Sequence, residues 1–412
     1  MPTPFPIDNL PYGVISTTDN PTPRCATVLE DRAIDLSALE QDGFFQDFEG
    51  FQSSVFSQPT LNTFAALPKD SHRDVRARLI TALASPETQI QYGIPLASIR
   101  NHLPMATSNF SDFYCSLEHA RNCGDIMNIA IPQNWFCIPS VYNGRTSSLR
   151  ISQTPVRRPH GVYTTPDTPT PQFQPSRRFD FELEVGVFVS RPFPAGEVLD
   201  IAHARDHIFG LVILNDWSAR DIQGFEMNPL GPFHSKGSGT SISPWIVTVE
   251  ALDAVACPVV GVTQDPPPLR HLTWPGKKEE ATFDVDLEAR VIRKGKTYHV
   301  TQTNLNELYW TPYQQMTHLT SAGEGLTTGD IFGTGTVTSS RTDSSGVKIG
   351  IACLLERALP QNRLESLQKD GIVFLEDGDE VVMEGWCVSR VTGRRFGFGE
   401  CRGVILPALQ LS

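Results

Sequence analysis

A chain of 412 residues is too long for one small hydrophobic core, so we expect two domains. Its net charge of −12 at pH 7 disfavours nucleic acids and anionic membrane surfaces as partners, because both bind basic patches. The apolar stretches fall short of the ~20 residues that cross a bilayer, and the first residues lack the basic and apolar regions of a secretory signal, so we expect a cytoplasmic protein.

The N-terminal part of the chain contains short apolar segments and one predicted helix. That helix covers 71–83, where the apolar residues at helical spacing are Val75, Leu79, Ile80 and Leu83. Pro86 stops it, and the segment 94–104 links this part to the rest. We place a domain boundary near residue 105, which gives an N-terminal domain of residues 1–105 and a C-terminal domain of residues 106–412.

After this boundary the sequence indicates mainly β structure. The predicted strands are short and bounded by Gly, Pro, Asp or Asn, and they cover 181–189, 208–215, 245–249, 281–292, 330–337, 371–374 and 380–383. Two proline-rich segments, 164–176 and 263–276, are predicted to be loops. Many short strands with few helices favour a sandwich or a roll over a doubly wound sheet.

The segment 111–119 carries Asp112, Tyr114 and His119. If a helix begins here, Asp112 and His119 lie on similar sides, two turns apart. A lone histidine is more often structural than catalytic. A histidine near a carboxylate cluster, however, is a candidate general base, because its pKa suits proton transfer near neutrality.

Cysteines on both sides of this histidine suggest a zinc site as an alternative. Cys115, His119 and Cys123 follow an i, i+4, i+8 spacing, which spreads the outer pair over ~12 Å along a helix, too far for one tetrahedral ion. No local signature supports a Cys-His nucleophilic pair. None of the eight cysteines forms a C-x-x-C pair, so we expect reduced thiols.

Acidic and apolar residues alternate between 179 and 189. In a strand, Asp180, Glu182 and Glu184 would share one face. Carboxylates this close repel one another and raise each other's pKa unless a cation lies among them. A solvated strand face is the simpler interpretation. The other acidic residues of the chain favour a second interpretation, in which this run is half of a metal site.

Two further residues extend this candidate site. Asp216 follows the buried strand predicted at 208–215, where a carboxylate can also serve as a helix cap. Lys236 lies between glycines in the segment 231–240, which could approach a ligand closely or could simply be a flexible surface loop. The segment does not have the Walker A spacing, so phosphate binding is not supported.

Together these carboxylates form an all-oxygen set. Such a set selects a hard ion, Mg²⁺ or Ca²⁺, and its members are Asp112, Glu182, Glu184 and Asp216. The set is strongly negative, so a divalent ion in it could also bind an enolate or a 1,3-dicarbonyl substrate.

Several stretches of the chain together resemble the fumarylacetoacetase family. The longer ones are Ser-Asp-Phe-Tyr at 111–114, Asp-Phe-Glu-Leu-Glu at 180–184, Asn-Asp-Trp-Ser-Ala-Arg-Asp at 215–221 and Pro-Leu-Gly-Pro-Phe at 229–233. Others are at 10–14, 142–145, 243–245, 333–336 and 377–380. The resemblance covers nearly the whole chain. It implies a small N-terminal SH3-like barrel, a larger C-terminal β-roll, a homodimer, and cleavage of a carbon–carbon bond in a 1,3-diketo acid at the end of tyrosine breakdown.

The resemblance also implies roles for individual residues. The metal ligands would be Asp112, Glu182, Glu184 and Asp216, with Lys236 and Thr240 beside them. His119 would activate water and be oriented by Glu356, while Lys236 and Gln223 would stabilise the oxyanion. The residues that would contact the substrate are Tyr114, Tyr142 and Thr336.

Two positions depart from the family pattern. Asn128 stands where the family has a substrate-binding arginine, so a bidentate carboxylate clamp is lost. Met227 stands where the family has a tyrosine, so a hydroxyl donor is lost. The substrate is therefore fumarylacetoacetate or a related compound.

The residues leave two other functions open. One is an enzyme of the same fold that uses an enolate for decarboxylation or tautomerisation, and the other is a binding protein without activity. The retained His119, Glu356 and Lys236 favour hydrolysis over the first. The full set of carboxylates argues against the second, because clustered carboxylates without a function would only cost stability.

Overall fold

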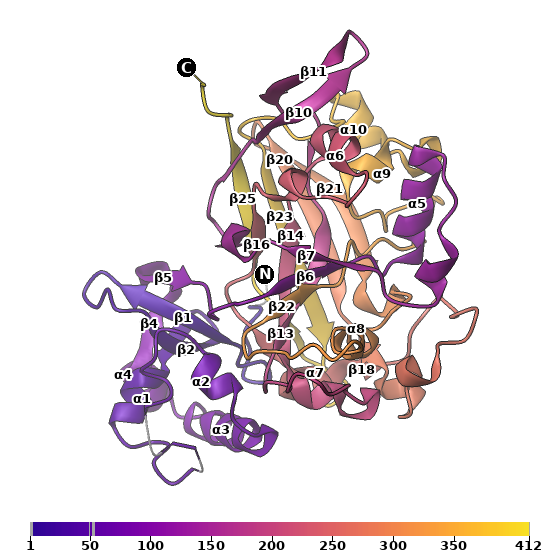
Figure 1. Cartoon of the computed structure of the whole chain (residues 1–412). Coiled ribbons are helices and arrows are strands. Elements are labelled where there is room, and N and C mark those ends of the chain that lie inside the picture. The colour runs from indigo at the N-terminus through magenta and orange to yellow at the C-terminus, as the bar shows by residue number, and fades with distance from the viewer. Residues whose placement is uncertain (1–2, 49, 52–53, 412) are drawn as a thin grey trace.

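The computed structural model describes residues 3–48, 50–51 and 54–411. Its N-terminal part is an antiparallel five-stranded sheet of order β4-β3-β2-β1-β5, shown at the lower left of Figure 1. The strands are β1 (Tyr12–Thr17), β2 (Arg24–Leu29), β3 (Arg32–Asp35), β4 (Gly93–Pro95) and β5 (Ile99–His102).

Four helices accompany this sheet, and they are α1 (Leu36–Gln41), α2 (Asn62–Ala65), α3 (Lys69–Ala82) and α4 (Pro86–Tyr92). The helix predicted at 71–83 is confirmed as α3, which buries Val75 and Leu79. Pro86 not only follows this helix but begins the next one, because its fixed backbone angle suits the first turn.

The C-terminal part is built on two larger sheets. The first has eight strands, with the order β7-β6-β22-β13-β14-β16-β8 and β17 pairing with β14. Its strands are β6 (Phe110–Phe113), β7 (Val141–Gly144), β8 (Leu149–Ile151), β13 (Leu183–Val189), β14 (Ile208–Asp216), β16 (Thr240–Ile242), β17 (Val247–Thr248) and β22 (Ile331–Gly333). β13 and β14 are buried along their whole length and form the centre of the molecule.

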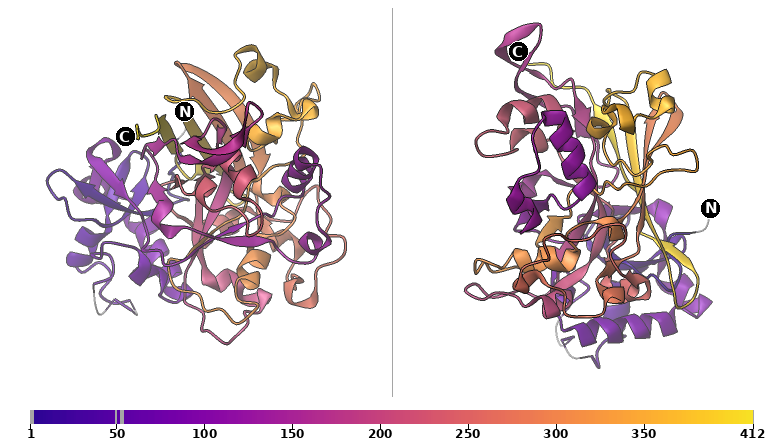
Figure 2. Two further views of the ribbon diagram at one scale, coloured as in Figure 1. Left: turned by 45° about the horizontal axis from the view of Figure 1, so that its top comes forward. Right: turned by 90° about the vertical axis from the view of Figure 1, so that its right-hand side faces the viewer.

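The second sheet has the order β21-β20-β23-β25-β9, and β24 pairs with β23. Its strands are β9 (Val156–Arg157), β20 (Asp286–Arg293), β21 (Lys296–Asn304), β23 (Glu380–Val388), β24 (Arg395–Gly397) and β25 (Cys401–Leu406). Val185 and Ile213 of the first sheet share one hydrophobic core with Leu287 and Met383 of the second. The two views of Figure 2 show these strands curling into a half-barrel beside the N-terminal sheet. The prediction of a mainly β chain, with a small N-terminal β unit and a larger C-terminal roll, is confirmed.

Shorter elements complete the C-terminal part. Three two-stranded ribbons are formed by β10 (His160–Thr165) with β11 (Thr168–Pro175), β12 (Phe179–Asp180) with β15 (Ser218–Ala219), and β18 (Ala256–Cys257) with β19 (Thr282–Phe283). The helices are α5 (Leu117–Met127), α6 (Arg220–Glu226), α7 (Val249–Leu252), α8 (Pro312–His318), α9 (Leu354–Arg357) and α10 (Glu365–Lys369). None of the helices in the described part of the chain has the length and apolar character needed to span a bilayer.

The structure corrects several sequence predictions. The segment 164–176 is not a loop but the turn and second strand of the projecting β10–β11 hairpin, whose exposed strand tolerates prolines because it lies at an edge (Figure 1). The segment 371–374 forms no strand, and its first residue, Gly371, has a φ of 65°. Of the strand predicted at 245–249 only β17 forms, and Val249 already begins α7.

The N-terminal sheet packs directly on the C-terminal roll. Tyr12 pairs with Ile246, and the ring of His72 packs on Phe209 of β14 with 5.4 Å between the ring centroids. One cluster of buried side chains includes Phe64 of α2 and Val212 of β14. The boundary near residue 105 lies between β5 and β6, and the division into two folding units stays a prediction.

Candidate active site

The carboxylates predicted to bind a metal lie where β6, β13 and β14 run side by side with β22. Asp112 of β6 pairs with Gly333 of β22. A Cβ atom on Gly333 would lie only 2.7 Å from Oδ1 of Asp112 and 2.7 Å from Oε2 of Glu184. Glycine is therefore required here, because a side chain would fill the space that the two carboxylates share.

Three of the four predicted carboxylates come together. Asp112, Glu184 and Asp216 are each buried and offer ligand oxygens that all lie within 4.8 Å of one another. Burial and the neighbouring carboxylates raise the pKa of Asp112 and of Glu184 well above their usual range. Oδ1 of Asp112 is buried without a hydrogen-bond partner among the described residues. A hard divalent cation fits this site, because it would neutralise the repulsion and coordinate the free oxygen.

Neighbouring donors fix the orientation of these carboxylates. The hydroxyl of Tyr142 donates to Oδ2 of Asp112 at 2.8 Å and lies 3.2 Å from Oδ2 of Asp216. The backbone N–H of Gly335 donates to Oε2 of Glu184 at 3.0 Å. The hydroxyl of Thr240, which faces Asp216 across β14 and β16, lies 3.5 Å from Oδ1 of Asp216. Asp216 is thus the last residue of a strand and not a helix cap.

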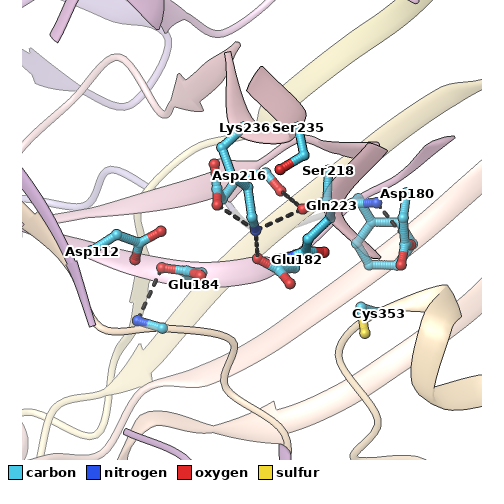
Figure 3. A network of polar contacts seen from close by, with 12 residues as sticks. Asp112, Asp180, Glu182, Glu184, Asp216, Ser218, Gln223, Ser235, Lys236 and Cys353 are labelled. Atoms are coloured by element: carbon cyan, nitrogen blue, oxygen red, sulfur yellow. Dashed lines mark hydrogen bonds and ion pairs between the residues drawn. The ribbon is translucent and has the colours of Figure 1, made fainter. Parts of the chain in front are cut away.

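The fourth carboxylate, Glu182, is engaged by two cations instead. Its two oxygens pair with Nζ of Lys236 and, at 2.7 Å, with Nη1 of Arg220. Burial raises the pKa of Glu182, but the charges of Lys236 and Arg220 outweigh it and hold the pKa well below its usual range. Lys236 is not a surface lysine, since only 9% of its side chain is exposed, and Nζ also lies 2.6 Å from Oδ2 of Asp216. Figure 3 shows this lysine between Glu182, Asp216 and Ser218.

Asp180 does not lie with Glu184 as a continuous strand would require. The strand is interrupted between β12 and β13, and Figure 3 shows Asp180 on the far side of Glu182. Its carboxylate accepts the backbone N–H groups of Leu354 and Leu355 at 2.8 and 2.9 Å and pairs with Arg220 at 2.9 Å. Asp180 therefore holds the first turn of α9 next to the site.

His119 and Glu356 form a buried pair. Nδ1 of His119, on α5, lies 2.8 Å from Oε2 of Glu356, on α9. The same carboxylate accepts hydrogen bonds from Asn122 at 2.8 Å and from the Thr338 hydroxyl at 2.7 Å. Burial raises the pKa of Glu356, but His119 and these donors outweigh it and lower the pKa to about 2. Burial lowers the pKa of His119, yet the neighbouring Cys123 and Glu356 raise it well above its usual range.

The helix that carries His119 begins later than the sequence suggested. Asp112 lies on β6, and α5 starts at Leu117, where the hydroxyl of Ser116 accepts the backbone N–H of His119 at 3.0 Å. The two residues therefore do not share a helix face. They belong to successive elements of the chain that both reach the site.

Three of the remaining predicted residues contact or adjoin residues of the site. The rings of Tyr114 and His119 are in edge-to-face contact, 5.2 Å apart, and Thr336 is buried next to Gly335. Gln223 accepts a hydrogen bond from Arg220 at 3.1 Å.

Asn128 and Met227 lie at the ends of α5 and α6. Asn128 is exposed and caps α5 with a left-handed backbone, at a φ of 55°, and Met227 ends α6 with 36% of its surface exposed.

A cleft with a volume of about 1190 Å³ opens beside the carboxylates and is lined, among other residues, by Ser111, Tyr142, Glu226, Phe233 and Phe332. Tyr142 and Phe233 also line a smaller pocket that reaches Asp216 and Lys236. A ligand in the cleft would therefore pass Tyr142 to reach the buried charges.

Sequence reasoning missed several residues that organise the site. Arg220 joins Asp180, Glu182 and Gln223, and its place inside the stretch 215–221 was the available signal. Asn122 and Thr338 hold Glu356, but nothing in their local sequence marks them. Both act through a residue that is distant along the chain, so only the fold brings them into contact.

Comparison with known proteins identifies the family of this chain. Residues 8–104 match the family model described as fumarylacetoacetase N-terminal, and residues 108–405 match fumarylacetoacetate (FAA) hydrolase C-terminal. The fumarylacetoacetase of Arabidopsis thaliana is 40% identical over 417 residues, which cover 98% of this chain and 96% of that protein. The human fumarylacetoacetase is 37% identical over 419 residues, covering 98% and 97%.

Solved structures show the same fold at low sequence identity. A fumarylacetoacetate hydrolase from the psychrophilic Exiguobacterium antarcticum superposes with a TM-score of 0.52 at 14% identity, over 97% of this chain and 99% of that one. A maleylpyruvate hydrolase from Sphingobium gives a TM-score of 0.51 at 15% identity, over 96% and 100%. Because the family models and the more similar relatives cover nearly the whole chain, this protein belongs to the fumarylacetoacetase family of hydrolases that cleave carbon–carbon bonds.

Proposed function

We propose that His119 is the general base of a metal-dependent hydrolysis and that Glu356 orients it. The single observation that carries this proposal is the contact of 2.8 Å between Nδ1 of His119 and Oε2 of Glu356, next to a buried cluster of three carboxylates. Water loses a proton to the imidazole as it attacks a carbonyl, and the carboxylate stabilises the imidazolium that forms. Because the pKa of His119 is raised, activity increases with pH as the imidazolium loses its proton.

We propose Asp112, Glu182, Glu184 and Asp216 as the residues that hold Mg²⁺ or Ca²⁺, with Lys236 and Thr240 beside them. A divalent ion bound here supplies a Lewis acid for the oxygens of a diketo substrate. Support comes from the convergence of Asp112, Glu184 and Asp216 and from the free oxygen of Asp112. Glu182 would join them by exchanging part of its contact with Lys236.

Contacts of two polar side chains support a site for negative charge on the attacked carbonyl. Lys236 is a fixed, buried cation between Asp216 and Glu182. Gln223 accepts from Arg220 through its amide oxygen, which leaves its amide N–H groups to donate toward a ligand. We propose that Lys236 and Gln223 form the oxyanion site.

The substrate is proposed to be fumarylacetoacetate or a related 1,3-diketo acid. Tyr142 at the inner wall of the cleft, Tyr114 against His119, and the buried Thr336 would contact it. Asn128 and Met227 lack the guanidinium and the hydroxyl that the family pattern has at their positions. These two residues favour a related substrate as the alternative to fumarylacetoacetate.

A homodimer is proposed from the same family relationship. Apolar side chains are exposed around the mouth of the cleft, with 94% of Leu230 and 50% of Phe233 accessible in the single chain. Burial of such a surface against a second copy would be favourable. Light scattering coupled to size-exclusion chromatography measures the mass directly.

The deciding experiment follows the absorbance of fumarylacetoacetate in the presence of the purified chain and Mg²⁺ or Ca²⁺, with and without a chelator. We expect a chelator-sensitive loss of the diketone band, with fumarate and acetoacetate as products. Absence of turnover in protein shown by calorimetry to bind the ion would refute fumarylacetoacetate as the substrate. The same assay with other diketo acids would then identify the related compound.

A further inference from the structure

Two thiols flank the pair formed by His119 and Glu356. Sγ of Cys353 lies 3.1 Å from Oε2 of Glu356, and Sγ of Cys123 lies 3.7 Å from Nε2 and 4.0 Å from Nδ1 of His119. The candidate ligand atoms of His119, Cys353 and Glu356 all lie within 4.8 Å of one another, and all three side chains are buried. Figure 3 shows Cys353 at the edge of the charged network, away from Asp112 and Glu184.

We propose that His119, Glu356, Cys353 and Cys123 form a second metal site, selective for Zn²⁺ and similar thiophilic ions, and that its occupation inhibits the enzyme. The binding itself stands on the ligand geometry. The inhibition rests on the proposed function, because it requires His119 to be the base.

The spacing of these atoms suits a tetrahedral ion. With Zn–S and Zn–N bonds of about 2.3 and 2.0 Å, neighbouring ligand atoms lie roughly 3.3–3.8 Å apart. Ligand atoms of His119, Glu356 and Cys353 already lie within 4.8 Å of one another, with contacts of 2.8 Å from Nδ1 and 3.1 Å from Sγ to Oε2 of Glu356. Sγ of Cys123 lies 4.0 Å from Nδ1, so its side chain would move inward to complete the site as the fourth ligand. Two thiols, an imidazole and a carboxylate make a ligand set of the kind found around zinc in proteins.

No local sequence motif marks this site, because its ligands come from two distant segments of the chain. Cys115, His119 and Cys123 cannot all bind one ion on a helix, because they spread over ~12 Å. The fold instead brings Cys353, at the N-terminal end of α9, next to His119 of α5. Cys353 thus takes the place that Cys115 cannot reach.

The two sites differ in the ions they prefer. The cluster of Asp112, Glu184 and Asp216 offers only carboxylate oxygens, which suit Mg²⁺ and Ca²⁺. The second site offers thiol sulfur and imidazole nitrogen, which bind Zn²⁺ far better than they bind Mg²⁺. An excess of Mg²⁺ should therefore not displace Zn²⁺ from it.

Zinc at this position would remove the base from catalysis. An ion that occupies Nδ1 of His119 and Oε2 of Glu356 replaces the proton they share, and each coordinating thiol releases a proton to solvent. Glu356 then no longer orients the imidazole.

The first test measures hydrolysis by the full chain at saturating Mg²⁺ while free Zn²⁺ is set with a metal buffer. We expect inhibition that added Mg²⁺ does not relieve. Cys353→Ser and Cys123→Ser should each raise the inhibitory Zn²⁺ concentration by about tenfold or more, because even outer-shell changes alter metal affinity by about 10- to 100-fold. Cys137→Ser, which removes a more accessible thiol outside the site, should behave like the wild type. Inhibition that Mg²⁺ reverses, or an inhibitory Zn²⁺ concentration that is unchanged from the wild type in both cysteine variants, would overturn the proposal.

A second test does not depend on activity. Co²⁺ is added to the Glu184→Gln protein, in which the carboxylate site is impaired, and the near-ultraviolet spectrum is recorded. We expect a thiolate-to-cobalt charge-transfer band at one equivalent, lost on addition of Zn²⁺ and weakened by Cys123→Ser. This band reports metal binding at the thiol site whether or not the protein hydrolyses the proposed substrate. It also remains a test if Cys353→Ser does not fold. Absence of the band in correctly folded Glu184→Gln protein would overturn the second metal site.

Discussion

Oε2 of Glu356 lies 2.8 Å from Nδ1 of His119, and this contact joins α9 to α5. Asn122 and the hydroxyl of Thr338 donate to the same carboxylate at 2.8 and 2.7 Å. Thr338 is itself anchored, because its backbone carbonyl accepts the Ser116 hydroxyl at 2.6 Å. A carboxylate held this firmly fixes the ring orientation of His119 and makes the neutral imidazole a stronger base.

The first prediction concerns this orientation. Glu356→Gln keeps the size of the side chain but removes the charge that stabilises the imidazolium. We expect the rate of hydrolysis to fall by about 100-fold or more, which is the range for loss of general-base catalysis. The affinity for Mg²⁺, measured by isothermal titration calorimetry, should stay within error of the wild type, because Glu356 lies outside the carboxylate cluster.

Glu384→Gln is the matched control for this change. Glu384 pairs with Arg290 at 2.5 Å on β23, away from the site. Its neutralisation should leave the rate unchanged. A Glu356→Gln protein that hydrolyses the substrate at the wild-type rate would exclude Glu356 as the residue that orients the base, His119.

The second prediction contrasts two neighbouring glutamates in the absence of metal. The folded state disfavours the charged form of Glu184, whose pKa is raised by burial and by Asp112. Glu184→Gln should therefore increase the free energy of unfolding of the metal-free protein by about 1 kcal/mol or more. Glu182 is stabilised as an anion by Lys236 and Arg220, so Glu182→Gln should lower the free energy of unfolding by about 3 kcal/mol.

The two glutamate variants also test how metal binding changes stability. Mg²⁺ at one hundred times its dissociation constant should stabilise the wild type by about 2.7 kcal/mol, and this gain should be lost in Glu184→Gln. Urea unfolding with and without Mg²⁺ measures both effects. Equal destabilisation of the two variants without metal would contradict the opposite electrostatics assigned to the two glutamates.

The sequence was informative where chemistry is carried by short motifs. The alternation around Glu184, the buried strand before Asp216 and the segment containing His119 all predicted site residues. It was misleading about Asp180, because alternation assumes a continuous strand and the chain leaves the sheet between β12 and β13. The exposed β11 shows a related difficulty, since prolines at a sheet edge resemble a loop in sequence.

Contacts between distant segments could not be predicted in the same way. Asn122, Thr338 and Cys353 are unremarkable in their local sequence, yet each touches a charged residue of the site. The space between Asp112 and Glu184 depends on Gly333 from a third strand. Such relationships arise from strand register, which a single sequence does not reveal.

The third prediction concerns the contact between the N-terminal sheet and the roll. His72 is buried, with a ring nitrogen 2.9 Å from the carbonyl of Phe64, and burial together with the nearby Lys69 lowers its pKa from 6.5 to about 4. The unfolded chain therefore binds more protons between pH 6.5 and pH 4, so stability falls as the pH is lowered through this range. The difference amounts to about 3 kcal/mol.

His72→Gln removes this titration while an amide nitrogen can still donate to Phe64. The free energy of unfolding, measured in urea between pH 4 and 7, should depend less on pH than in the wild type. His203→Gln, at an imidazole that is 70% exposed, serves as the control and should retain the wild-type slope. A ring resonance of His72 that titrates near its ordinary value would contradict the prediction.

The last prediction concerns substrate recognition at the ends of α5 and α6. Asn128→Arg combined with Met227→Tyr puts a guanidinium and a phenol hydroxyl at the ends of α5 and α6, where the family pattern has them. A hydrogen bond to a charged group contributes about 1.5–3 kcal/mol, so kcat/KM for fumarylacetoacetate should rise by about tenfold or more. The arginine would also adopt the left-handed backbone of Asn128, with its φ of 55°, and should lower stability by about 1 kcal/mol.

Asn128→Lys with Met227→Tyr separates charge from geometry. Lysine carries the same charge but cannot bind a carboxylate with two parallel hydrogen bonds, so its gain should be smaller than that of arginine. Steady-state kinetics on the three proteins and their melting temperatures test both parts of the prediction. Equal kcat/KM in all three would mean that these helix ends do not contact the substrate. Recognition would then lie with the partly buried Tyr114 and Tyr142 and the buried Thr336, which the chain shares with the family pattern.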